Sequence, residues 1–247
     1  FSNCRSLTTV VIPPGVTSIE RDAFEGCSGL TAISVDADNQ TYSSPGGMLY
    51  DYDGTTLILC PQGIKTADIS RGTRSIGDEA FRDCTGLRSI SMPQGVSNIG
   101  NRAFKNCTAL TSIKLPKSVS AIGDEAFSGC AKLKNVTIQH GTKTIGAQAF
   151  YGCSSLTSIS LPGSVNGIGS GVFEGCINLT GIKVASGNSS YTSVDGILLD
   201  KSGTTVIVCP QGVKKVALPE GVTSIGNGAF KGCQGLTVIN IPEGVTA

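Results

Sequence analysis

The segment from Leu110 to Cys130 carries a pattern of apolar and polar positions that recurs along the chain. Ile113 and Leu115 alternate with polar neighbours, which is typical of a β-strand with one buried face. Pro116 follows at once and ends the strand, because proline has no backbone N–H for a strand ladder. Each copy of the pattern therefore predicts one short strand.

The rest of the same copy predicts a return path. Val119 and Ile122 are the apolar positions of a second, shorter extended stretch. Gly123 is expected to take a backbone turn that is closed to residues with a side chain. The A-F-x-x-C motif at residues 126–130 is too short for a full helix, so we expect one helical or 3₁₀ turn there.

This pattern returns at a fixed period. Each of the eight phenylalanines is followed three residues later by a cysteine, and from Phe81 to Phe173 successive phenylalanines are 23 residues apart. A period of this size predicts a solenoid, in which each coil buries its apolar face against its neighbours. The predicted strands end at Ile12, Val35, Ile69, Met92, Leu115, Ile138, Leu161, Val184, Leu218 and Ile241. These positions predict ten parallel strands.

Two of the steps between strand ends are 34 residues instead of 23 and define two enlarged coils, residues 36–69 and 185–218. The two enlarged coils lie 149 residues apart and resemble each other in sequence. In each, two apolar segments flank a short turn that ends in glycine, at residues 52–54 and 201–203. This arrangement predicts a β-hairpin insertion in each enlarged coil.

The motif L-x-x-I-x-L-P-x-x-V-x-x-I-G-x-x-A-F-x-x-C, read at residues 110–130 and 133–153, resembles the BspA-like (treponemal-type) leucine-rich repeat. The hairpin segment at residues 195–198 is also similar to that family. The resemblance implies a leucine-rich-repeat solenoid, a right-handed β-rich superhelix with short helical or 3₁₀ turns. It covers essentially the whole chain, so we expect a single solenoid over residues 1–247, cut inside a repeat at both ends.

The same resemblance implies a secreted or cell-surface protein of a host-associated bacterium or a parasitic protist. Relatives act in adhesion to host matrix proteins or to other cells, so the leading hypothesis is a non-enzymatic protein that binds a host extracellular-matrix or cell-surface protein. A structural stalk that presents another domain and a carbohydrate-binding repeat are the alternatives. The family offers no shared catalytic or ligand motif to transfer, and no cofactor is expected.

Composition narrows the class of partner. The chain has 19 basic and 18 acidic residues with no block of like charge. Nucleic-acid binding needs a basic patch, so no nucleic-acid partner is expected. The longest apolar runs are far shorter than the roughly 18 residues that a membrane-spanning helix needs, so no span is expected in this segment.

Ten cysteines, an even number, raise the possibility of disulfides. They occur once per coil at a near-constant distance before the strand end, which favours a buried column of small side chains. Disulfides between neighbouring coils are the alternative. Zinc is disfavoured, because it needs four convergent ligands and the chain has no C-x-x-C pair and only one histidine, His140.

The sequence gives little support for a calcium site, a catalytic histidine or a phosphate-binding loop. The acids Asp36, Asp38, Asp51 and Asp53 are numerous enough to bind calcium, but loop acids in solvent are the favoured interpretation. His140 is expected to lie in a surface loop, with no residue marked as its catalytic partner. The glycine-rich segment at residues 167–171 lacks the spacing of a phosphate-binding loop. We therefore predict no catalytic, cofactor or metal site.

Partner contact is assigned to the enlarged coils and to lysines on the exposed side of the strands. Tight interfaces use aromatic and basic anchors, and the tyrosines lie mainly in the enlarged coils. Packing of these tyrosines onto the rod is the alternative. The predicted partner-binding residues are Tyr42, Tyr50, Tyr52, Asp53, Tyr191, Lys201, Lys114 and Lys183.

Overall fold

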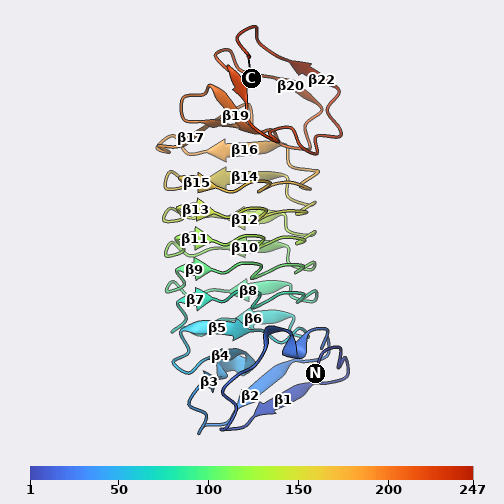
Figure 1. Ribbon diagram of the computed structural model, residues 1–247, viewed down its shortest axis with the longest axis vertical. Coiled ribbons are helices and arrows are strands. Elements are labelled where there is room, and N and C mark those ends of the chain that lie inside the picture. The colour runs from blue at the N-terminus through green and yellow to red at the C-terminus, as the bar shows by residue number, and fades with distance from the viewer. Residues whose placement is uncertain (247) are drawn as a thin grey trace.

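The computed structural model describes residues 1–246 as a rod of stacked coils, with β1 near one end and β22 near the other (Figure 1). Ala247, the last residue of the predicted solenoid, lies outside the described residues. One long strand per coil forms a first column, and its paired neighbours run parallel, as in Ser112 opposite Asn135. The long strands are β1 (Thr9–Ile12), β2 (Ala32–Val35), β6 (Thr66–Asp68), β8 (Ser89–Ser91), β10 (Ser112–Lys114), β12 (Asn135–Thr137), β14 (Ser158–Leu161), β16 (Gly181–Val184), β20 (Lys215–Ala217) and β22 (Val238–Asn240). The leucine-rich-repeat solenoid is thus confirmed.

A second column of short strands runs beside the first (Figure 1). Its members pair in parallel, and Ile122 lies between Ile99 and Ile145 in a buried row of isoleucines. The short strands are β7 (Ser75–Ile76), β9 (Asn98–Ile99), β11 (Ala121–Ile122), β13 (Thr144–Ile145), β15 (Gly167–Ile168) and β21 (Ser224–Ile225). This column is the predicted second extended stretch.

The enlarged coils add antiparallel strands to this second column. In the first, β4 (Leu49–Asp51) pairs antiparallel with β3 (Tyr42–Ser43) on one side and with β5 (Thr56–Leu59) on the other. β5 then pairs in parallel with β7 and so takes the place of a short strand. In the second, β17 (Tyr191–Val194), β18 (Ile197–Asp200) and β19 (Thr205–Val208) repeat this order, and β19 pairs with β21.

The A-F-x-x-C segments differ from the prediction. A 3₁₀ turn forms at η1 (Arg21–Phe24), and the other short helix, η2 (Pro45–Gly47), lies elsewhere. In the regular coils these segments are turns whose amides donate to the next coil, as Phe104 N does to Ala126 O at 2.7 Å and Phe127 N to Ala149 O at 2.7 Å. We call them the corner segments and their bonds the corner ladder. Isolated turn bonds of the expected 3₁₀ type remain, as from Lys105 N to Arg102 O at 3.0 Å, but they alternate with the bonds between coils and form no continuous helix. No helix within residues 1–246 has the length and hydropathy to cross a membrane.

The reason for the repeated glycine also differs from the prediction. Gly123 is absent from the positive-φ residues, and Glu125, two residues later, takes the left-handed conformation with φ 53°. A Cβ atom on Gly123 would lie 2.6 Å from the backbone carbon of Gly100 in the preceding coil. The glycine is therefore required by the close approach of two coils rather than by its own backbone angles.

Phenylalanine and cysteine form the core of the regular coils. The rings of Phe81, Phe104, Phe127, Phe150 and Phe173 stack one on the next with centroids 4.8–5.8 Å apart. The buried apolar residues form three clusters that divide at the enlarged coils. Leu49 and Tyr50, adjacent in β4, belong to different clusters, as do Leu198 and Leu199 in β18.

Candidate binding surfaces

Tyr50 lies in the core, and its assignment as a partner contact is wrong. Its side chain is 0% exposed, and its hydroxyl oxygen accepts a bond from the Ser70 N–H at 3.3 Å. Burial raises the pKa of Tyr50 above its ordinary value. Leu49 and Leu57 of the same antiparallel pair are equally buried. The two arms of this pair therefore build the rod instead of projecting from it, because their apolar side chains are needed inside.

Tyr42 and Tyr191 are half-buried, and their side chains pack against the apolar core clusters of the rod. The Tyr42 hydroxyl accepts a bond from the Ile19 N–H at 3.1 Å, which ties the enlarged coil to the coil before it. Tyr191 lies at the equivalent place, 149 residues later, and its N–H donates to the Asn188 side chain at 2.8 Å. Both therefore support the packing alternative.

Tyr52 and Asp53 lie in the exposed turn between β4 and β5. Tyr52 keeps 52% of its surface exposed. Asp51 fixes the turn, because its carboxylate accepts bonds from the N–H groups of Thr55 at 2.7 Å and Thr56 at 2.9 Å. Burial alone would raise the pKa of Asp51, but the bonds from Thr56 and Thr55 outweigh it and lower that pKa. The turn thus presents one aromatic and one acidic side chain from a rigid base.

Lys201 replaces Tyr52 in the second enlarged coil. Its ammonium group donates to the Asn188 carbonyl oxygen at 2.6 Å, so the side chain is bonded back onto its own coil. Asp200 holds this turn as Asp51 holds the first, through bonds from the N–H groups of Thr204 and Thr205 at 2.8 and 2.9 Å. The two turns share one frame and present different chemistry.

Lys114 and Lys183 point outward from β10 and β16, on the flat face of the long strands. β10 and β16 are three strand spacings apart in the first column, which is about 14 Å at about 4.8 Å per spacing. Small polar residues surround them, including Ser112, Asn135 and Ser160. The predicted partner-binding residues therefore do not gather in one site: Tyr52 and Asp53 share a turn, and the two lysines share this face.

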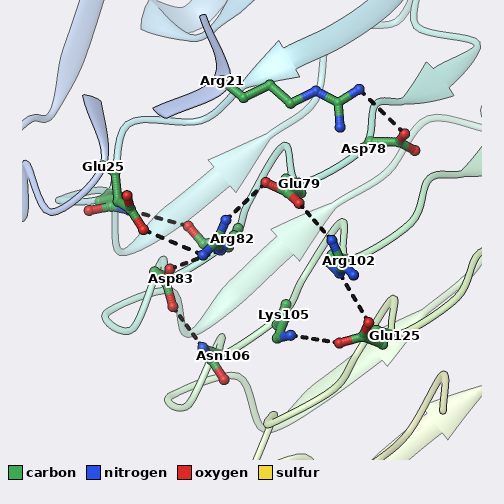
Figure 2. Close-up of polar contacts among 11 residues, drawn as sticks. Arg21, Glu25, Asp78, Glu79, Arg82, Asp83, Arg102, Lys105, Asn106 and Glu125 are labelled. Atoms are coloured by element: carbon green, nitrogen blue, oxygen red, sulfur yellow. Dashed lines mark hydrogen bonds and ion pairs between the residues drawn. The ribbon is translucent and has the colours of Figure 1, made fainter. Parts of the chain in front are cut away.

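The corner face carries a charged network that the sequence analysis did not identify (Figure 2). Arg102 binds Glu79 at 3.4 Å and Glu125 at 3.0 Å, and Lys105 binds Glu125 at 2.6 Å. Bonds to Lys105 and Arg102 lower the pKa of Glu125. The recurrence of a charged residue just before A-F, at Glu79, Arg102 and Glu125, was the available signal.

Two buried asparagines, which the sequence analysis also missed, join the enlarged coils to the rod. Asn39 and Asn188 are each 1% exposed. The Asn188 amide donates to the carbonyls of Pro162 at 3.1 Å and Val165 at 2.7 Å in the coil before it. Asn39 makes the same pair of bonds at its own coil, at 2.9 and 3.0 Å. Each amide therefore bonds its enlarged coil to the coil before it.

The other sequence candidates lie where a structural role accounts for them. The cysteines of residues 1–246 are free thiols, and most of them are buried. The Asp36 carboxylate accepts a bond from the Asp38 N–H at 3.0 Å, and Asp51 holds its turn. His140 is exposed in a loop. No three His, Cys, Asp or Glu side chains in the described part of the chain gather as metal ligands do.

A family model for the BspA type leucine rich repeat region matches residues 1–68, 74–194 and 209–247 in six copies. The chain belongs to the BspA-type leucine-rich repeat family. No curated protein matches the chain at a significant level.

Solved structures of three bacterial proteins are similar to this chain in fold. A leucine-rich cell surface protein of Faecalibacterium prausnitzii is 27% identical, with a TM-score of 0.62 over 97% of this chain and 62% of that one. A leucine-rich repeat protein of T. pallidum is 27% identical, with a TM-score of 0.55 over 84% of this chain and 82% of its own. The pneumococcal vaccine antigen PcpA has the same fold at 22% identity, with a TM-score of 0.63 over 99% of this chain and 63% of that one. The chain thus spans a little over three-fifths of two of these relatives.

Proposed function

We propose that this BspA-type chain is a non-enzymatic repeat protein of a bacterial surface, or a secreted one, that binds host or microbial proteins. The observation that carries the proposal is the regular flat face of the long strands. Pairing at the 23-residue period sets Lys114 beside Thr137 and Ser160 beside Lys183, so exposed side chains repeat in straight rows. Solenoids use such extended surfaces for binding. The neighbouring cell surface protein and vaccine antigen support a surface location.

Tyr52 is the anchor that we propose at the edge of this rod. Aromatic side chains that are exposed in a free protein are frequent energetic centres of protein interfaces. Tyr52 stands on a turn that Asp51 fixes, so little ordering is needed when it binds. Lys114 and Lys183 are proposed to contribute attraction to acidic partner surfaces rather than anchoring contacts.

Adhesion of the purified chain tests this proposal. Beads coated with the chain are applied to immobilised extracellular-matrix proteins and to cultured epithelial cells, and bound beads are counted. We expect Tyr52→Ser to lower binding while Tyr151→Ser, which also replaces an exposed tyrosine (42% exposed), leaves it unchanged. Equal binding by the Tyr52→Ser variant would remove Tyr52 as the anchor. No binding by the unaltered chain to any surface would favour the stalk, and binding that glycosidase treatment abolishes would favour a carbohydrate ligand.

A further inference from the structure

The enlarged coils lack a corner segment, and each leaves a gap in the corner ladder. The first gap lies between the coils of Phe24 and Phe81, and the second between the coils of Phe173 and Phe230. Both pairs of phenylalanines are 57 residues apart in sequence, against 23 in the regular coils. At each gap, one coil's worth of corner backbone is missing between two coils that would otherwise bond to it.

In the second gap, the enlarged coil replaces part of the missing backbone. The Cys209 N–H donates to the Ala229 carbonyl at 2.7 Å. The Gln211 side-chain amide makes the two bonds that a backbone peptide group would make. Its Oε1 accepts a bond from the Gly175 N–H at 2.9 Å, and its Nε2 donates one to the Lys231 carbonyl at 2.7 Å. Three of the bonds expected across a corner segment are thus made by other means.

Three further backbone groups face the second gap without a partner. In the regular coil before it, the N–H groups of Gln148 and Phe150 donate to the next corner segment at 2.9 and 3.0 Å. The equivalent N–H groups of Gly171 and Phe173 have no acceptor within residues 1–246, and neither does the Asn227 carbonyl have a donor there. Two donors on one wall therefore face one acceptor on the other.

The first gap shows what a closed version looks like (Figure 2). Arg82 enters it and binds Glu25 at 3.4 Å and Glu79 at 3.1 Å, leaving a cavity of only about 30 Å³. In the second gap, Gly228 occupies the position equivalent to Glu79. The cavity at the second gap has a volume of about 690 Å³. This volume is in the range of about 300–1,000 Å³ that is usual for ligand pockets.

The charges around the second gap favour a neutral ligand. Lys231 and Glu174 are the charged residues that line it, and they bind each other at 3.1 Å. The free groups are backbone N–H and C=O groups, whose natural complement is another peptide backbone.

We propose that the second gap binds a short peptide segment of a partner protein, which adds its backbone to the corner ladder. The segment's carbonyls accept from Gly171 and Phe173, and its intervening N–H donates to Asn227. This inference rests on the proposed function, because it assigns a site to the binding of a protein partner.

The ladder also restricts the sequence of the bound segment. Its middle residue corresponds to Glu125, Arg102 and Gln148, which all take left-handed backbone angles with φ of 53–54°. A flexible peptide adopts this conformation readily only at glycine or asparagine. The following residue corresponds to Ala126 and Ala149, both 0% exposed, so it must be small. The expected motif is any residue, then glycine or asparagine, then alanine, serine or glycine.

Amide hydrogen exchange of the free chain tests the open ladder. We expect the amides of Gly171 and Phe173 to exchange at least about tenfold faster than those of Gln148 and Phe150, because a hydrogen-bonded amide must open before it exchanges. Equal protection of all four amides would overturn the inference.

Peptide selection tests the ligand. The probe is a phage-displayed library of random seven-residue peptides, selected on the unaltered chain and counter-selected on the variant Gly228→Glu with Lys231→Arg, which copies Glu79 and Arg82 of the closed gap. We expect enriched peptides to carry the motif and to bind the variant about tenfold or more weakly. The matched control is the single variant Lys231→Arg, which we expect to bind the enriched peptides as the unaltered chain does.

A second measurement requires no variant. Addition of an enriched synthetic peptide is expected to protect the amides of Gly171 and Phe173 from exchange and to leave that of Phe127 unchanged. Failure to enrich any peptide, or equal binding by the closed variant, would overturn the inference. If beads coated with the Gly228→Glu, Lys231→Arg variant still adhere, the proposed function stands but does not use this gap. If only Tyr52→Ser lowers adhesion, the contact is made by the turn and not by the gap.

Discussion

The Sγ atom of Cys130 lies 3.1 Å from the backbone carbonyl oxygen of Phe104, in the coil before it, and donates a hydrogen bond to it. Cys107 and Cys153 make the same bond to the phenylalanine one coil earlier, at 3.1 and 3.2 Å. A thiol is small enough for the core and still satisfies a carbonyl at the corner. The column of cysteines is therefore a hydrogen-bonded column as well as an apolar one.

Thiol labelling follows from this burial. At pH 8, we expect a small aromatic disulfide reagent to react quickly with Cys4, which is exposed, and more slowly with Cys233, which is half-buried. The remaining thiols react only after denaturation, because burial removes access and raises the pKa of Cys176 to about 12. Mass spectrometry of the labelled native chain measures the pattern. Rapid labelling of Cys130, or a disulfide between neighbouring coils, would contradict it.

Replacement of Gly123 by alanine is expected to lower the melting temperature. Its Cβ would meet the Gly100 backbone at 2.6 Å, and overpacking of this kind costs about 1–3 kcal/mol. Gly187→Ala is the matched control, because no atom lies within 4 Å of a Cβ at that position. Thermal unfolding followed by circular dichroism compares the two variants. Equal melting temperatures of the two variants would show that the coils can move apart at Gly123 without a loss of stability.

Asn188→Ala tests the joint of the second enlarged coil. The variant leaves the Val165 carbonyl without its donor, while the Pro162 carbonyl keeps its bond from the Val165 N–H, and an unpaired buried polar group costs about 1–3 kcal/mol. Asn178→Ala removes an amide that also bonds a carbonyl, that of Ser154 at 2.7 Å, but in an exposed setting. We expect the melting temperature to fall clearly only for Asn188→Ala. A similar fall in both variants would mean that burial is unimportant here.

The Asp51 turn should be sensitive to acid. The pKa of Asp51 is lower in the folded chain than in the unfolded one, so its stabilising effect is complete above the unfolded value of about 3.9 and is lost as pH falls through the folded value. Asp51→Asn should therefore lower the melting temperature at pH 7, and this effect should shrink as the pH falls below about 3.9. Asp53→Asn, in the same exposed turn, is the control. A difference in melting temperature that stays constant as the pH falls would assign the effect to shape rather than charge.

The regular coils could be predicted from the sequence because their rules are local. Alternation around Ile113 fixes a strand, and a 23-residue period fixes its neighbour. The corner could not be predicted this way, because Phe104 and Ala126 bond across coils and leave no mark in local periodicity. Tyr50 was misplaced for a related reason: a tyrosine in an insertion is equally compatible with either face of its strand until the register is known.

The candidate site was the least predictable part. The second gap depends on the unpaired N–H of Gly171, on the absence of a side chain at Gly228 and on the bond that the Gln211 side chain makes. None of these features forms a sequence motif. Comparison of the coils that follow the two enlarged coils, at the same 149-residue offset, was the available signal, since it pairs Glu79 with Gly228.

The division of the core at the enlarged coils has a mechanical consequence. Leu49 and Tyr50 point into different clusters, and so do Leu198 and Leu199. The stack of five phenylalanine rings runs from Phe81 to Phe173, and the stacked pair of Phe1 and Phe24 lies beyond the first enlarged coil. A repeat protein holds together through the interfaces between neighbouring units. Under a pull along its axis, the rod is therefore a chain of three blocks joined at two seams, and the load it bears is set by those seams rather than by the regular coils.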